Sequence, residues 1–208
     1  MYFSISTWFV RVKKMNETAT TCRHLAALVL MMDEIQRYFM NELEYGIAAL
    51  PGHPESWAFV GMDTGRALAQ LEFVRDCLRE VPSPRFVDCG AGLGFIGMLA
   101  RGLGFRPGGI ELSSRYVEIA NRLFAEASVA EGNVLDFSDY GEFDVIYYYG
   151  PFKDDAMQEQ FEIKVERDAM PGAIIIANRK VSDTWQNSPD FRLLKEDGVG
   201  SWIFQKRR

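Results

Sequence analysis

The sequence predicts an α/β fold in which helices cover both faces of one mostly parallel sheet. Three observations support this prediction. Short apolar runs alternate with helical segments from Phe86 to Ala177, a glycine-rich turn follows the first run, and two strand-like runs close the chain at Phe191–Lys195 and Ser201–Lys206. Alternating strands and helices give parallel strands with right-handed crossovers, and a closing hairpin places an antiparallel strand at the sheet edge. We therefore expect seven strands, all parallel except one.

Each expected element has its own signal. Apolar residues at helical spacing predict helices at Phe95–Arg101, Arg115–Ala125 and Asp155–Arg167. The run Ala173–Ala177 is apolar throughout, as in a strand covered on both faces. The other strands that precede the hairpin are expected at Phe86–Cys89, Gly108–Leu112, Ser128–Glu131 and Phe143–Tyr149.

The N-terminal part predicts two further helices, Thr18–Met40 and Thr64–Glu80, separated by a loop rich in glycine and proline. We expect residues 1–57 to form an N-terminal extension and helical cap, and residues 58–208 to form the ligand-binding domain. The apolar run Met1–Val10 precedes its basic residues, the reverse of a secretory signal, and is too short to span a bilayer. A natural start at Met15 is the alternative for this region.

Composition narrows the functional classes. The 208 residues are 48% hydrophobic and 25% charged, which is typical of a globular protein. A net charge of −6 disfavours nucleic acid as a partner. Three widely spaced cysteines indicate a reducing compartment, and hence the cytoplasm, and two histidines give no zinc-site spacing, so we expect no metal.

The segment Asp88–Gly94 has the composition of a ligand-binding turn. Gly90, Gly92 and Gly94 allow the backbone to turn tightly and to approach a ligand closely, and ligands of open α/β sheets bind where strands end. The same glycines, with Gly97, also fit the dinucleotide pattern of nicotinamide-dependent oxidoreductases. Asp88 favours the cationic groups of S-adenosylmethionine (SAM) over a pyrophosphate, and the closing hairpin is foreign to a plain dehydrogenase sheet.

Residues at the ends of the next strands complete the candidate site. Glu111 can accept hydrogen bonds from two ribose hydroxyls. Asp136 can accept the amino group of adenine while Phe137 covers the ring, although a simple turn is the alternative. Tyr149 and Phe152 are candidates for the wall of an acceptor pocket, whereas Tyr147 can equally be a core residue.

These motifs together resemble the class I SAM-dependent methyltransferases, from about Phe59 to the C-terminus. Asp88–Gly94 matches the family's first motif, Glu111 its ribose acid and Asp136 its adenine acid, and Met170–Ile176 resembles its fifth-strand signature. The resemblance implies a Rossmann-like sheet, SAM as cofactor and methyl transfer. It also implies that the cofactor contacts Thr64, Leu112 and Tyr148.

A finer resemblance concerns the methyl acceptor. Tyr149–Phe152 and Asn178–Lys180 are similar to segments of two groups of non-SET protein lysine methyltransferases, in which the loop Phe59–Thr64 would close over SAM. This implies an amine acceptor on a protein or small molecule, with Tyr149, Phe152 and Asp154 as candidate catalytic residues and no membrane partner. The alternatives are a small-molecule or RNA methyltransferase, a nicotinamide-dependent oxidoreductase and a non-catalytic SAM-binding protein.

Overall fold

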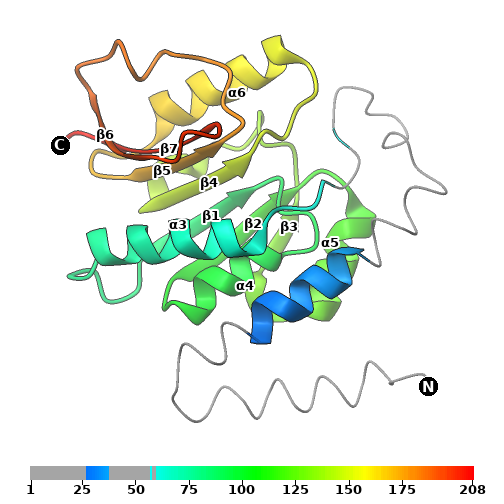
Figure 1. The fold of residues 1–208 in the computed structure, drawn as a ribbon. Coiled ribbons are helices and arrows are strands. Elements are labelled where there is room, and N and C mark those ends of the chain that lie inside the picture. Colours follow the sequence, from blue (N-terminus) through cyan, green and yellow to red (C-terminus); the bar gives the residue numbers. More distant parts are fainter. Residues whose placement is uncertain (1–26, 38–56, 58–59) are drawn as a thin grey trace, which may run out of the picture.

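A computed structural model describes residues 27–37, residue 57 and residues 60–208, and these residues form one seven-stranded sheet with helices on both faces (Figure 1). The strand order is β3-β2-β1-β4-β5-β7-β6. The strands are β1 (Arg85–Cys89), β2 (Arg106–Glu111), β3 (Val129–Glu131), β4 (Val145–Tyr149), β5 (Ile174–Asn178), β6 (Phe191–Glu196) and β7 (Ser201–Lys206).

One strand runs against the others. β1 to β5 pair in parallel, β7 pairs antiparallel with β5, and β6 pairs antiparallel with β7. The sheet direction therefore reverses only at β7. The prediction of seven strands with a single antiparallel one is confirmed, but its place at the sheet edge is wrong, because β7 lies between β5 and β6 and β6 forms the edge.

The two faces of the sheet carry separate cores. Helix 27–37, α3 (Thr64–Cys77), α4 (Phe95–Gly102) and α5 (Ser114–Leu123) cover one face, and α6 (Asp155–Asp168) covers the other (Figure 1). Alternate strand residues supply the two cores, since Val145 and Tyr147 belong to the first and Ile146 and Tyr148 to the second. Met32 of helix 27–37 is fully buried in the first core, which ties this helix to the main domain.

The predicted elements match the structure to within a few residues. α3 ends at Cys77, three residues before the predicted end, and β6 is one residue longer than predicted. Within Thr18–Met40, residues 27–37 are helical, whereas 18–26, 38–40 and the N-terminal extension lie outside the described residues. No helix of the described part has the length and apolar character that crossing a membrane requires. The domain boundary between residues 57 and 58 stays a prediction.

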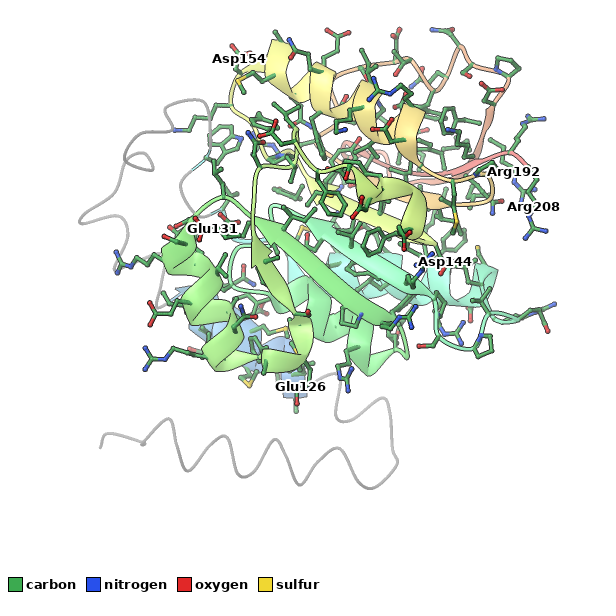
Figure 2. The ribbon with its side chains drawn as sticks, turned by 180° about the vertical axis from the view of Figure 1, so that it is seen from behind. Glu126, Glu131, Asp144, Asp154, Arg192 and Arg208 are labelled. Carbon is green, nitrogen blue, oxygen red and sulfur yellow. The ribbon has the colours of Figure 1, made fainter. Side chains whose placement is uncertain are left out.

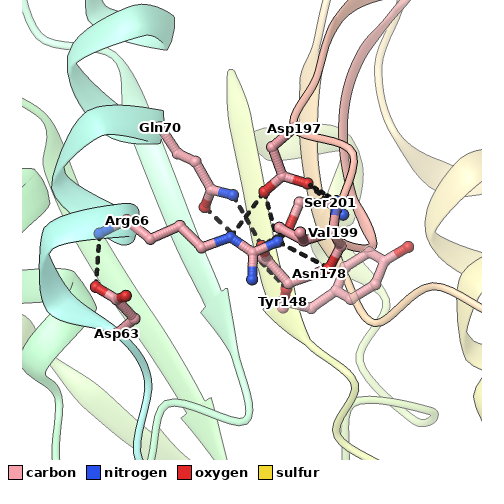
Figure 3. A network of polar contacts seen from close by, with 8 residues as sticks. All are labelled: Asp63, Arg66, Gln70, Tyr148, Asn178, Asp197, Val199 and Ser201. Atoms are coloured by element: carbon pink, nitrogen blue, oxygen red, sulfur yellow. Dashed lines mark hydrogen bonds and ion pairs between the residues drawn. The ribbon is translucent and has the colours of Figure 1, made fainter.

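A buried polar network fixes α3 and the closing hairpin at the carboxyl end of β5 (Figure 3). The Asn178 side chain is fully buried, where its Oδ1 accepts hydrogen bonds from Gln70 Nε2 at 2.8 Å and from the Ser201 hydroxyl. Asn178 Nδ2 donates to the carbonyl of Tyr148. Arg66 completes the network by pairing with Asp197 in the β6–β7 turn. This network positions the loop after β5 relative to the end of β4.

Candidate cofactor and acceptor site

A cavity opens at the carboxyl ends of β1, β2 and β4. In Figure 2 this edge lies on the side of Glu131, the last residue of β3, whereas Asp144 and Arg192 mark the opposite edge. Helix 27–37 contributes Gln36 to the wall, and the segment before α3 contributes Trp57, Val60 and Met62. The sheet side is lined by Asp88, Gly90–Leu93, Ile110–Leu112, Gly132–Val134, Tyr147 and Tyr149–Phe152.

The glycine loop forms the floor of this cavity, as predicted. Gly90, Gly92 and Gly94 have φ values of 83°, 52° and 77°, which residues with a side chain rarely adopt. The N–H groups of Gly90 and Ala91 both donate to the carbonyl of Ile110, so the loop is fastened to β2. Gly94 is the N-cap of α4 and is absent from the cavity lining.

Gly109 is a structural requirement of the loop that sequence reasoning missed. A Cβ atom at this position would lie 2.7 Å from the Cβ of Ala91 and 3.1 Å from a methyl of Val129. Such distances are well inside van der Waals contact, so the loop would have to move. In the sequence, Gly109 appears only as part of the pair Gly108–Gly109. The need for glycine there becomes visible only when the packing of the glycine loop against β2 is known.

Two carboxylates lie buried on the cavity wall. Asp88 is 3% exposed and Glu111 is 7% exposed. Burial raises the pKa of Asp88 from 3.8 to about 8, and the negative charge of Glu111 adds to the shift. Burial also raises the pKa of Glu111, while backbone hydrogen bonds oppose that shift. The site is therefore complementary to a ligand that brings positive charge to Asp88.

Glu111 also organises the loop. Its Oε2 accepts the N–H of Gly92 at 2.9 Å, and its Oε1 accepts the N–H of Ser113 at 2.8 Å. Each carboxylate oxygen has a further lone pair, so Glu111 can still accept hydrogen bonds from a ligand. Leu112 lines the cavity beside it.

The segment after β3 contributes different residues from those predicted. Asp136 is exposed, and Phe137 packs edge-on against Tyr140 with ring centroids 5.0 Å apart; neither lines the cavity. Asn133 and Val134 line it instead. Asn133 Oδ1 accepts the N–H of Leu135 at 2.9 Å, which turns the chain here and leaves its amide N–H groups available. The sequence feature that could have pointed to Asn133 is the pair Gly132–Asn133, which directly follows β3.

The three tyrosines of β4 have different environments. Tyr148 is buried against Phe161 in the second core, outside the cavity lining. Tyr147 is 1% exposed and lines the cavity, and its hydroxyl has no hydrogen-bond partner in the described part of the chain. Tyr149 and Phe152 line the cavity as well, and their roles in the acceptor wall and in catalysis stay predictions. Strand alternation explains why Tyr147 and not Tyr148 reaches the ligand side.

Two predicted site residues have structural contacts away from the cavity lining. The Thr64 hydroxyl donates to Asp33, which joins α3 to helix 27–37. Asp154 is the exposed N-cap of α6, where its carboxylate accepts the N–H of Met157 at 2.9 Å (Figure 2). Neither residue lines the cavity. Their predicted roles in cofactor binding and catalysis stay predictions, and each has a structural role as well.

Cationic side chains surround the aromatic rim of the cavity. The guanidinium carbon of Arg179 lies 4.7 Å from the ring centroid of Trp57 and 5.8 Å from that of Tyr149. Lys153 Nζ lies 5.3 Å from the centroid of Trp57. The indole N–H of Trp57 donates to the carbonyl of Phe152 at 2.8 Å, which holds the ring at the rim. Sequence reasoning missed Trp57, Lys153 and the position of Arg179.

Comparison with known proteins gives a clear result for the fold. No protein-family model matches the chain, and no curated protein matches its sequence. Solved structures do match. Cofactor-bound Rv0187 from MTB aligns with a TM-score of 0.55 at 16% identity, covering 73% of this chain and 83% of that one. An RNA methyltransferase from Salinibacter ruber, in complex with S-adenosyl-L-homocysteine, aligns with a TM-score of 0.51 at 18% identity, covering 67% and 92%.

A candidate methylase from Haemophilus influenzae, HI0767, aligns similarly, with a TM-score of 0.52 at 18% identity and coverage of 67% and 89%. The chain therefore has the fold of the class I SAM-dependent methyltransferases. Because fold alone does not fix chemistry, the activity has to be argued from the cavity.

Proposed function

We propose that the protein is a SAM-dependent methyltransferase. The observation that carries the proposal is the pair of buried carboxylates, Asp88 and Glu111, on one wall of the cavity above the glycine loop. Two buried carboxyl groups give a pyrophosphate no cation to pair with, and they suit a ligand that combines a cation with hydroxyl groups. This favours SAM over a nicotinamide dinucleotide.

The cavity lining offers a partner for each part of SAM. Asp88 suits its positively charged end, and Glu111 suits the ribose hydroxyls. Asn133 and Val134 suit the adenine, the first through its amide and the second through apolar contact. We assign the adenine contact to Asn133 because Asp136 is exposed outside the lining.

SAM, when bound, supplies a methyl group that its sulfonium already activates. The protein then has to align the acceptor with the methyl group and to exclude water. Tyr149 and Phe152, at the carboxyl end of β4, form the wall that the acceptor meets. Burial raises the pKa of Tyr147 well above its usual value, so its hydroxyl stays protonated and can donate a hydrogen bond into the cavity.

The acceptor atom in this proposal is an amine, as the resemblance to lysine enzymes implies. Support for a protein lysine is weaker. That expectation relied on aromatic faces that attract a cation, but Arg179 already covers the rings of Trp57 and Tyr149. The net charge of −6 disfavours RNA. A small molecule is therefore the favoured acceptor.

Calorimetric titration tests the cofactor first. We expect S-adenosylhomocysteine and SAM to bind and NADH to give no heat of binding. Incubation with methyl-labelled SAM and fractionated lysate then tests turnover, and Tyr149→Ala and Phe152→Ala should lower turnover far more than SAM affinity. Binding of NADH in preference to SAM would refute the proposal. SAM binding without label in any fraction would indicate a non-catalytic SAM-binding protein.

A further inference from the structure

Arg179 has a backbone conformation that is unusual for a residue with a side chain. Its φ value is 55°, in the left-handed region where glycine is favoured. Arg179 and Ser128 are the two residues other than glycine with positive φ among those the structure describes. Strained backbone of this kind concentrates at functional sites. A long cationic side chain held in this conformation at the rim of the cavity therefore suggests a ligand contact.

Both neighbours of Arg179 are anchored in buried polar networks. Asn178 belongs to the network that joins α3, β4 and β7 (Figure 3). On the other side, Lys180 Nζ lies 3.1 Å from Glu162 and 2.8 Å from Glu166, with all three side chains buried. The N–H of Arg179 itself donates to the carbonyl of Gly200 at 2.9 Å. The backbone is thus fixed on both sides, and the exposed guanidinium is held over the rim.

The guanidinium lies over aromatic rings and has no anionic partner among the described residues. Its central carbon lies over the rings of Trp57 and Tyr149, and contact with a ring face does not use up the N–H donors of the group. Neither Arg179 nor Lys153 forms an ion pair or a side-chain hydrogen bond with any residue in the described part of the chain. Such a pre-oriented fork matches a carboxylate or a phosphate.

We propose that Arg179, assisted by Lys153, binds an anionic group of the methyl acceptor, which is a small molecule carrying a carboxylate or a phosphate. The inference rests on the proposed function, because the acceptor has to reach the cavity from this rim. Asp88 and Glu111 lie on the cofactor side, so the cavity separates a wall of carboxyl groups for the cationic cofactor from a positive rim for the acceptor. A lysine side chain of a protein acceptor would have to pass Arg179 and Lys153, and repulsion between like charges disfavours such an acceptor.

Small ring compounds of different charge test the rim directly. Phenyl phosphate, benzoate, benzyl alcohol and benzylamine are titrated into the protein saturated with S-adenosylhomocysteine, at low salt. We expect at least one of the two anions to bind about tenfold more tightly than the alcohol, and the amine to bind more weakly than the alcohol. The two anions distinguish a phosphate from a carboxylate. Equal binding of all four compounds, or binding of none, would overturn the proposal.

Arg179→Gln should abolish the preference for anions without changing the affinity for S-adenosylhomocysteine. The matched control is Arg192→Gln, because Arg192 is an exposed arginine at the opposite edge of the sheet (Figure 2). Arg179→Gly serves as a second variant, since glycine tolerates the observed φ and its melting temperature should stay within about 3 °C of the wild type. An anion preference that survives in both Arg179 variants would overturn the assignment.

Labelled SAM distinguishes the source of the acceptor. The small-molecule fraction of a lysate is divided on an anion-exchange column at about pH 11, where an amine is neutral and a carboxylate or phosphate keeps its charge. Total RNA and total protein are assayed beside it. We expect the label in the retained, anionic small molecules, and Arg179→Gln should raise KM for that pool more than it lowers kcat. Label in RNA, in protein or only in the unretained pool would overturn the anionic small molecule but leave the methyltransferase assignment standing. Failure of S-adenosylhomocysteine to bind would count against the proposed function itself.

Discussion

The protonation of Asp88 should couple SAM binding to pH. In the free protein the pKa of Asp88 is raised to about 8, so the carboxyl is mostly protonated at neutral pH. A cationic ligand favours the ionised form, and its binding therefore has to release the proton. We predict that SAM affinity rises with pH up to about 8, and that Asp88→Asn removes this dependence.

The pKa of Asp88 sets how strongly SAM affinity depends on pH. Below the pKa of the free protein, affinity falls by up to tenfold per pH unit, which gives about a 50-fold loss between pH 8 and pH 6. Calorimetry at pH 6, 7 and 8, in two buffers of different ionisation enthalpy, measures affinity and proton release together. About 0.9 proton should leave at pH 7. Titration of the amino group of SAM is common to wild type and Asp88→Asn, so the ratio of their affinities isolates Asp88.

The stability of the free protein provides an independent check. Between pH 4 and pH 8 the folded state holds the Asp88 proton and the unfolded state has lost it, so stability falls as pH rises through this window. The shift of the Asp88 pKa from 3.8 to about 8 sets an upper limit of about 6 kcal/mol on this loss of stability. Asp88→Asn should therefore raise the melting temperature more at pH 8 than at pH 5. For the binding experiment, the same pH dependence of SAM affinity in the wild type and in Asp88→Asn would refute the coupling between SAM binding and the ionisation of Asp88.

Three further substitutions test other parts of the structure. Glu111→Ala should weaken SAM binding by about 1.5–3 kcal/mol through lost hydrogen bonds to a charged group. The control is Glu131→Ala, because Glu131 is the exposed residue of β3 that pairs with Glu111, and this change should leave the calorimetric affinity for SAM unchanged. Gly109→Ala should displace the glycine loop and reduce SAM affinity about tenfold while circular dichroism stays native; unchanged affinity would contradict the packing argument. Lys180→Met leaves two buried glutamates without their cation and should lower the urea-unfolding free energy by about 3–5 kcal/mol, and a loss below about 1 kcal/mol would contradict that role.

The fold could be predicted largely from local pattern. β1, β4 and β5 are short apolar runs bounded by turns, and the predicted hairpin matches β6 and β7 almost residue for residue. The glycine loop and Glu111 were also predictable, because strand ends of a parallel sheet converge at one edge. These features depend on periodicity and on backbone requirements, which a sequence records directly.

The ligand-facing side chains were decided by tertiary structure. Tyr148 was expected at the cofactor, but the pleat turns it into the second core and brings Tyr147 to the cavity. Asn133 occupies the lining near the predicted Asp136, because the chain turns immediately after β3. Trp57, Lys153 and Arg179 form the rim together, although Trp57 and Arg179 are 122 residues apart in sequence. No local sequence pattern connects these segments. Sequence determined where the strands end, whereas packing between distant segments decided which side chains meet there.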